Sequence, residues 1–320
     1  MRILITGITG FIGTHLAEHA SKQKNVEVFG FRRLGSKKPA YRAAQLFDCD
    51  ICDEKKIALI LKKIKPSHIF HLAGISSVSQ SWENPETTFR INVGGTRSLL
   101  ESVVKNCPAA RVLVASSAEV YGSSPSERKK FDENSPFRPK NPYAVSKIAQ
   151  EFTAYQYFLN HKLFVVRTRA FNHIGPGQSE VYVASNFAKQ VAQIEAHLQE
   201  ATLEVGNLNV IRDFLDVRDG AEAYWQCLEK GTSGDVYNIS SGIDHKVGEM
   251  LKYYLKQSAV TIKIKKKPSR VRAVDVAVLV GNSNKLWQKT GWQLKFSFEE
   301  TLSDILNDWR HKLRSEIRNK

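Results

Sequence analysis

RILITGITGFIGT, at residues 2–14, joins an apolar run to three glycines, and this stretch decides the fold. The run at residues 2–6 has the β-branched, apolar character of a buried strand. Gly7, Gly10 and Gly13 follow directly and open a helical pattern over residues 11–21. Glycines at this place permit a tight turn and a close backbone approach to a pyrophosphate, whose charge the helix N-terminus favours. The stretch therefore predicts the strand, turn and helix that begin a dinucleotide-binding domain.

The same strand-then-helix rhythm continues through the first half of the chain. Apolar runs at residues 26–31, 68–72, 111–116 and 163–167 read as strands, and helical patterns cover residues 55–64, 90–105 and 143–159. Near-continuous apolar strands that alternate with helices are typical of a parallel sheet covered on both faces. We therefore predict an α/β fold with a doubly wound Rossmann sheet.

The rhythm loosens after Phe171, where the turn-rich segment NHIGPGQ begins. We expect residues 1–171 to form the cofactor-binding Rossmann domain and residues 172–320 to form mainly a smaller C-terminal α/β lobe that binds substrate. Residues 212–230 look like a strand end and a helix that rejoin the first sheet. Two lobes of this kind meet in a cleft, which is a common place for a ligand.

Charge gives a weaker indication of partners. The 320 residues include 47 Lys and Arg against 32 Asp and Glu, a formal net charge of +15. Such a surface attracts nucleic acid, anionic membranes or polyphosphate ligands. Much of the excess lies in the alternating run TIKIKKK at residues 261–267, which favours a solvated edge strand. The sequence shows no RNA-binding signature with interleaved aromatic residues, so we expect neither nucleic acid nor a membrane as partner.

Cysteine content and hydropathy restrict the class further. Four cysteines cannot supply a disulfide framework, and Cys49 and Cys52 form a single C-x-x-C with no second pair to complete a zinc site. We expect no metal; a redox pair stays open, but small buried residues near a strand end are favoured. The sequence has no run of about 18 apolar residues that would span a membrane, and its first residues lack a signal-peptide pattern. We expect a cytoplasmic protein.

Two arginines mark the end of the second strand. A site for NAD usually has an acidic residue about 20 residues beyond the glycines, where it bonds the ribose 2′-hydroxyl. Here Arg32 and Arg33 follow Phe31, and guanidinium groups match a 2′-phosphate, so NADP(H) is preferred over NAD(H). The alternative is two solvated arginines on a loop. Asp50 and Ile51 follow the next apolar stretch, where the carboxylate is placed to meet the adenine amine.

A tyrosine and a lysine suggest the chemistry. Tyr143 and Lys147 are spaced i, i+4 in PYAVSK, so both lie on one face of a helix that begins near Pro142. An ammonium beside the phenol is expected to lower the tyrosine pKa. Ser117 ends the strand RVLVASS and is placed to aim its hydroxyl at the same carbonyl oxygen. The three groups converge at the carboxyl edge of the sheet.

With these residues in view, the chain resembles the extended short-chain dehydrogenase/reductase family nearly from end to end. The likeness rests on TGITGFIGTHL, FHLAG, NVGGT, SSAEVYG, NPYAVSK, RAFNHIGPGQ, RDFLDVRD and YNISSG. It implies that Ser117, Tyr143 and Lys147 are catalytic and that the protein is a homodimer joined through the helices at residues 90–105 and 143–159. The residues that it implies for cofactor contact are Gly7, Gly10, Phe11, Ile12, Gly13, Arg32, Arg33, Asp50, Ile51, Leu72, Ala73, Gly74, Tyr143 and Lys147. Gly74 stands where many relatives have alanine, and we expect this change to leave binding undisturbed.

The residues after Ser117 separate the reactions of the family. The 4,6-dehydratases resemble Thr-Asp-Glu or Thr-Ser-Glu here, whereas this chain has Ser117-Ala118-Glu119. Ala118 cannot donate a proton, so elimination lacks its acid. Glu119 keeps a dehydratase open; its other role is to position the loop or the sugar.

The second half of the chain is similar to the GDP-6-deoxy-D-mannose reductases of the family, notably in RAFNHIGPGQ, FAKQVAQIE and VGNLNVIRDFLDVRD. That resemblance implies a nucleotide-diphosphate sugar, GDP-4-dehydro-6-deoxy-D-mannose, reduced by NADPH at C4 to GDP-D-rhamnose. A 4,6-dehydratase or a 4-epimerase is the alternative, and a non-enzymatic NADP(H)-binding regulator is a third reading. Substrate contacts are expected from Asn172, Lys189, Arg212 and Arg272, although each cation alone suits a surface salt bridge equally well.

Overall fold

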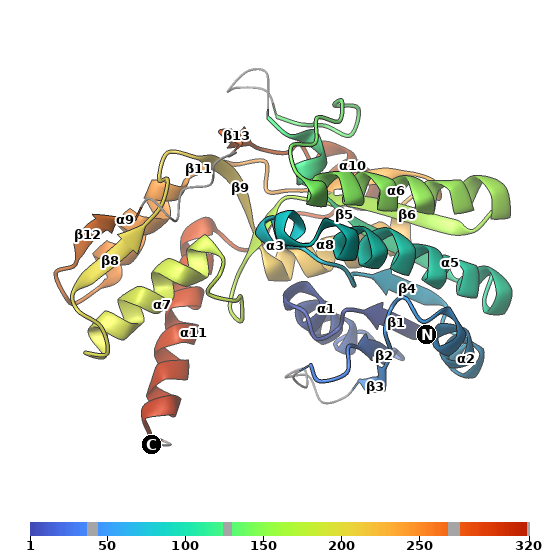
Figure 1. The fold of residues 1–320 in the computed structure, drawn as a ribbon, viewed down its shortest axis with the longest axis horizontal. Helices are drawn as coiled ribbons and strands as arrows, with labels where there is room; N and C mark the ends of the chain where they lie inside the picture. The colour runs from blue at the N-terminus through green and yellow to red at the C-terminus, as the bar shows by residue number, and fades with distance from the viewer. Residues whose placement is uncertain (37–43, 124–129, 268–275, 319–320) are drawn as a thin grey trace.

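The computed structural model describes residues 1–36, 44–123, 130–267 and 276–318. Strand β1 (Arg2–Thr6) lies inside a seven-stranded sheet (Figure 1). Ile3, Leu4 and Ile5 are all completely buried, because helices cover both faces of this sheet. Successive rather than alternate positions of the strand are therefore apolar.

The seven strands are all parallel to their neighbours, and the predicted doubly wound sheet is confirmed. Their spatial order is β10-β6-β5-β4-β1-β2-β3. Strand β3, which the sequence showed only as an apolar stretch, is short and lies at the edge. The bounds are β2 Glu27–Arg32, β3 Gln45–Asp48, β4 His68–His71, β5 Arg111–Ser117, β6 Phe164–Ala170 and β10 Val236–Ile239.

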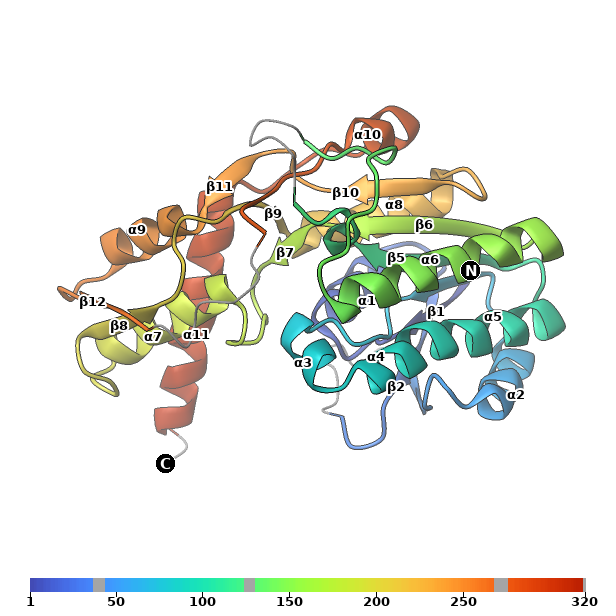
Figure 2. The same ribbon diagram turned by 45° about the horizontal axis from the view of Figure 1, so that its top comes forward.

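Two groups of helices cover the sheet (Figure 2). Helices α1 (Phe11–Ser21) and α8 (Val217–Lys230) pack together over one face. Helices α2 (Glu54–Ile64), α5 (Gly95–Asn106) and α6 (Pro142–His161) cover the other face. Each face thus has its own apolar core.

The helix predicted over residues 90–105 has two parts. A π-helical turn, η1 (Arg90–Gly94), precedes α5. Within this wider turn Asn92 is completely buried, and its amide bonds the backbone N–H of Ile75 at 2.8 Å and the backbone carbonyl at 3.1 Å. The side chain thereby fastens the turn to the segment that follows β4.

The smaller lobe has a four-stranded sheet made of β7 (Asn172–Ile174), β9 (Ile211–Asp216), β11 (Asp244–Lys246) and β13 (Val278–Leu279). Helices α7 (Val183–Glu195), α9 (Val247–Gln257) and α11 (Phe298–Arg318) pack around its core. The expectation that residues 212–230 rejoin the first sheet is wrong for the strand, because β9 pairs with β7, β11 and β13. Only α8 returns to the large sheet, and β10 supplies the added strand.

The basic run also forms a strand, β12 (Lys263–Lys266), paired with β8 (Thr202–Val205). All four side chains of β12 are exposed, which confirms the predicted solvated strand. Cys49 and Cys52 follow β3; Cys49 is buried, and burial raises the pKa of its thiol to about 11, as expected of an unreactive residue.

The described residues contain neither a membrane-spanning helix nor a metal-binding cluster. No helix among them is both long and apolar enough to cross a membrane. Their His, Cys, Asp and Glu side chains form no group of three that could hold a metal ion. The cytoplasmic location stays a prediction.

Candidate active site

The glycine turn is pressed against the end of β4. Gly7 has φ +73°, and a Cβ there would lie 2.9 Å from the backbone nitrogen of Ala73. A Cβ on Gly13 would lie 2.2 Å from the carbonyl oxygen of Gly7, so only glycine lets α1 come this close to β1. Gly10 caps α1 without a side-chain hydrogen bond, which leaves the first N–H groups of the helix to an anion.

The same turn touches the smaller lobe. Phe11 and Ile12 begin α1, and the ring of Phe11 packs edge-on against His15. His15 Nε2 lies 3.0 Å from the carbonyl oxygen of Pro176, within the predicted turn NHIGPGQ. The two lobes therefore meet at the mouth of the glycine turn.

Arg32 and Arg33, both predicted to meet a 2′-phosphate, have different surroundings at the end of β2. Arg32 donates through Nε and Nη2 to the carboxylate of Asp48, at 2.6 and 3.2 Å. Arg32 and Asp48 are partners in the β2–β3 register, and this pair lowers the pKa of Asp48. Arg32 thus holds two strand ends together, and Arg33 is the exposed arginine of the pair.

The ends of β3 and β4 complete this edge of the sheet. Asp50 is exposed and accepts a hydrogen bond from the backbone N–H of Cys52 at 2.9 Å, and Ile51 is buried against Gly95. Leu72, Ala73 and Gly74 follow β4. A Cβ on Gly74 would lie 2.8 Å from Asn92 Oδ1, so an alanine here would require that amide to move.

Tyr143 lies in the first turn of α6, and its pKa differs from the prediction. Asn141 caps the helix by accepting from the N–H of Ala144 at 2.8 Å, and Pro142 occupies the first position. Burial raises the pKa of Tyr143 well above its usual value, while its hydrogen bond with Ser117 opposes the rise. The expected lowering is therefore wrong, because burial outweighs the hydrogen bond with Ser117 and favours the protonated phenol.

Lys147 is buried one helical turn further along. Its Nζ donates to the carbonyl oxygen of Ala115 at 2.5 Å and to Oε1 of Gln150. Burial lowers the pKa of Lys147 to about 7, and the carboxylate of Glu151 opposes this change. Since its contacts run to β5 and along its own helix, the ammonium is not among the groups that shift the pKa of Tyr143.

Ser117 and Glu119 frame the same site from the end of β5. Ser117 Oγ accepts from the backbone N–H of Glu119 at 3.2 Å. The Glu119 carboxylate accepts from Asn141 Nδ2 at 3.1 Å, so it is tied to the cap of α6. Ala118 is buried at the start of a short 3₁₀ helix, η2 (Ala118–Tyr121), with no proton to donate.

Two residues near Tyr143 had no signal in the sequence. The hydroxyls of Ser76, after β4, and Tyr182, before α7, lie 3.3 Å apart and join the two lobes. Tyr182 also contributes to the raised pKa of Tyr143, so the two phenols are near enough to interact electrostatically. These residues are 106 positions apart in the sequence, so only the fold brings them together.

The residues predicted to bind substrate lie on separate elements of the smaller lobe, as far as the structure describes them. Asn172 begins β7, and its amide donates to the carbonyl of Asp213 at 3.3 Å. Lys189 pairs with Glu180 at 3.3 Å and lies over the ring of Trp309, so its contacts are within its own lobe. Arg212 lies in β9 and donates to the carbonyl of Ile211. Arg272 lies outside the described residues.

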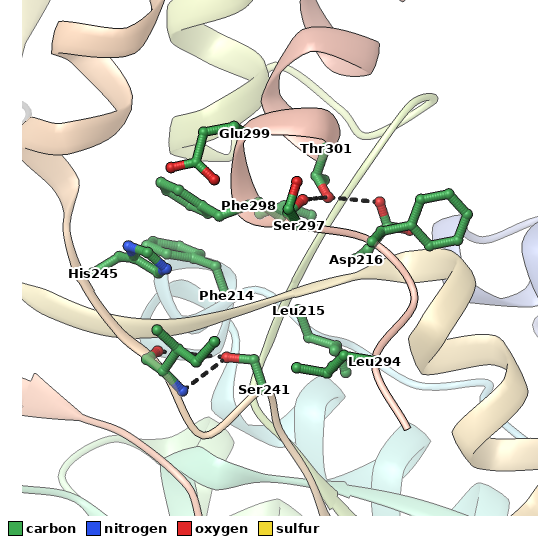
Figure 3. A pocket seen from close by; sticks show the side chains of 13 residues that line it. Phe214, Leu215, Asp216, Ser241, His245, Leu294, Ser297, Phe298, Glu299 and Thr301 are labelled. Carbon is green, nitrogen blue, oxygen red and sulfur yellow. Dashed lines mark hydrogen bonds between the residues drawn. The ribbon is translucent and has the colours of Figure 1, made fainter. Parts of the chain in front are cut away.

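A pocket of about 180 Å³ lies apart from this cluster, on the smaller lobe (Figure 3). It is bounded by β9, the segment at residues 294–299 and the start of α11. Phe298 stacks on His245 with ring centroids 3.8 Å apart, and Phe214 packs on Phe298 at 5.9 Å. Ser117, Tyr143 and Lys147 do not line this pocket, so we do not assign it to the reaction.

Comparison with known proteins shows the family of this chain. The family model for GDP-mannose 4,6 dehydratase matches residues 4–305. The chain is 31% identical over 315 residues to the GDP-6-deoxy-D-mannose reductase of Pseudomonas aeruginosa, a match that covers 98% of this chain and 99% of that protein. The chain belongs to the extended short-chain dehydrogenase/reductase family.

Solved structures of this family superpose on nearly the whole chain. RMD from Pseudomonas aeruginosa complexed with NADPH gives a TM-score of 0.86 at 30% identity, over 97% of this chain and 99% of that one. UDP-glucose 4-epimerase from Thermus thermophilus in complex with NAD gives 0.87 at 29% identity, over the same shares of the two chains. Extended short-chain dehydrogenases/reductases with different sugar chemistries thus share this backbone, and the choice among reactions depends on side chains.

Proposed function

We propose that this chain reduces the C4 ketone of GDP-4-dehydro-6-deoxy-D-mannose with NADPH, giving GDP-D-rhamnose. The observation that carries the proposal is the cluster of Ser117, Tyr143 and Lys147 at this site. Beside it lies Ala118, at the position where the 4,6-dehydratases have a residue that can donate a proton. The name of the Pseudomonas aeruginosa relative supports the same reaction. We assign the dinucleotide to the large lobe and the sugar to the boundary where the two lobes meet.

The residues of the large lobe fit a nicotinamide dinucleotide. Gly7 and Gly13 leave no room for a side chain at the turn, and Gly10 leaves the start of α1 open to a pyrophosphate. Arg33 is exposed at the end of β2, where it would meet a 2′-phosphate. We therefore propose NADP(H), as in one structural relative, over NAD, as in the other.

The protonation states suit reduction. When bound, NADPH supplies the hydride to C4. Tyr143 begins as a phenol because of its burial, and it donates its proton to the oxygen as negative charge develops there. Ser117 would hold that oxygen by a hydrogen bond, and the Lys147 ammonium would stabilise the phenolate that remains.

A 4,6-dehydratase is the second candidate, because Glu119 is present and the matched family model carries that description. Against it, the Glu119 carboxylate is engaged by Asn141, and Ala118 offers no proton for the leaving hydroxyl. A dehydratase or an epimerase regenerates its cofactor in each cycle, whereas a reductase consumes it.

Stoichiometry therefore decides between the candidates. The purified protein is mixed with the 4-keto sugar and NADPH, and the absorbance of NADPH is followed while the sugar product is identified. We expect one NADPH oxidised for each GDP-D-rhamnose formed. No sugar-dependent oxidation, together with conversion of GDP-mannose to the 4-keto sugar, would assign a dehydratase instead. Tyr143→Phe should lose turnover yet bind NADPH; unchanged turnover would exclude the phenol as proton donor.

We also propose a homodimer joined through α5 and α6. Val145, Phe152 and Leu159 are 42%, 48% and 48% exposed. Their seven-residue spacing puts them on one face of α6, and an apolar stripe of this kind suits a helix partner. A second copy would bury this stripe.

A further inference from the structure

An uninterrupted chain of buried hydrogen bonds joins Lys147 to the end of β4. Thr6, His71, Thr96 and Gln150 are all completely buried, and they come from β1, β4, α5 and α6. Gln150 Oε1 accepts from Lys147, and its Nε2 donates to Thr96 Oγ1 at 2.9 Å. Thr96 Oγ1 lies 2.8 Å from His71 Nε2, and His71 Nδ1 lies 2.8 Å from Thr6 Oγ1. Thr6 Oγ1 then accepts from the backbone N–H of Ala73 at 3.1 Å.

The neighbouring donors and acceptors fix the direction of each hydrogen bond in this series. Thr96 Oγ1 lies 2.6 Å from the carbonyl of Asn92, so its single proton is donated there. His71 must then donate from Nε2 to Thr96 and accept at Nδ1 from Thr6. This arrangement needs a neutral imidazole, and burial lowers the pKa of His71 to about 3. Thr96 Oγ1 can therefore only accept a hydrogen bond from Gln150. The amide of Gln150 must then point its N–H group at Thr96 and its oxygen at Lys147.

We propose that Gln150 is a positioning residue for Lys147: Thr96 and His71 hold its amide so that the carbonyl oxygen meets the ammonium, favours its charged form and directs it. An ammonium has three N–H groups. The carbonyls of Ala115 and Gln150 take two of them, so one is left for the cofactor and Tyr143. This inference rests on the proposed function for its consequence in turnover, but not for its effect on the charge of Lys147.

Other titratable groups face Lys147 from the elements packed around it. The neutral His71 lies on β4, and Glu151 on α6 favours the charged lysine. The Glu151 carboxylate pairs with Arg167 and Arg169 of β6, the latter at 2.7 Å, and acts on Lys147 through its charge. Gln150 is therefore the polar side chain that bonds the ammonium directly, and changing it should move the titration of Lys147.

Two nearly isosteric substitutions at Gln150 should act in opposite directions. Gln150→Leu removes the acceptor, so Lys147 should lose its proton about one pH unit lower; Gln150→Glu supplies a carboxylate, so the loss should come about one unit higher. Gln190→Leu is the matched control. Gln190 is a buried helical glutamine of the smaller lobe, bonded to both backbone groups of Glu204.

Two measurements are made across pH 6–9 on the full-length protein: the dissociation constant of NADPH by fluorescence, and kcat/KM for the 4-keto sugar. Opposite shifts of the binding midpoint in the two Gln150 variants, with none in Gln190→Leu, would support the proposal even if the sugar is not turned over. In that case only the proposed function fails. Midpoints equal to wild type, or shifted in one direction by all three variants, would overturn it. Thr96→Val, which releases the amide without touching Lys147, should shift the midpoint in the direction of Gln150→Leu and serves if that variant does not fold.

Discussion

Gly13→Ala tests the close approach of α1 to β1 most directly. The added Cβ would lie 2.2 Å from the carbonyl oxygen of Gly7 and 2.8 Å from Cα of Ile8. Ordinary contact begins near 3.4 Å, so the helix must move away by about 1.2 Å, and both obstacles are backbone that cannot rotate aside. Overpacking of this kind costs about 1–3 kcal/mol of unfolding free energy. It also moves the helix N-terminus away from the proposed pyrophosphate.

The assay is a pair of titrations, urea unfolding for stability and NADPH fluorescence for binding. We expect the dissociation constant of NADPH to rise at least tenfold, because hydrogen bonds to a charged group contribute about 1.5–3 kcal/mol. Gly94→Ala is the control: Gly94 has helical φ of −61°, and its Cβ would meet nothing within 4 Å. Its stability should stay the same or rise by up to about 1 kcal/mol. Wild-type NADPH affinity and stability in Gly13→Ala would refute the packing argument.

Three further predictions concern the cofactor, the assembly and pH. Arg33→Ala should weaken NADPH binding about 10- to 100-fold and leave NADH unchanged, because only NADPH carries the 2′-phosphate; equal losses for both would contradict this role. Phe152→Glu should convert a dimer to a monomer in light scattering, and a monomeric wild type would dismiss the interface. Lys147 has a folded pKa of about 7 against 10.5 when unfolded, so between these values the unfolded chain binds more protons and this residue makes stability rise with pH. Lys147→Met should reduce the rise in unfolding free energy by up to about 1.4 kcal/mol per pH unit above 7. Parallel curves of unfolding free energy against pH for the two proteins would count against a buried lysine with a lowered pKa.

Local signals could be predicted from the sequence. Gly7, Gly10 and Gly13 fix a turn within seven residues, and the spacing of Tyr143 and Lys147 requires only a helix. For such features, neighbours in sequence determine the geometry. The parallel sheet followed in the same way from apolar runs that alternate with helices.

Contacts between distant elements could not be predicted. Arg32 meets Asp48 only because β2 and β3 pair in one particular register. The raised pKa of Tyr143 depends on burial, which is a property of the folded chain, and so the pKa shift predicted from the sequence has the wrong sign. The bonds from Gln150 to Thr96 and from Thr96 to His71 cross three elements, and no spacing along the chain indicates them.

The return of β10 to the large sheet has a consequence for synthesis on the ribosome. Strand β6 needs β10 as its outer neighbour, yet 65 residues lie between Ala170 and Val236. At 5–20 residues per second, the nascent chain carries an unpaired strand edge for roughly 3 to 13 s. Over most of the same interval α8 has not yet been synthesised, so the sheet face that it covers together with α1 is only partly covered. A chain stopped at residue 171 would thus be an aggregation-prone fragment rather than a smaller dinucleotide-binding protein.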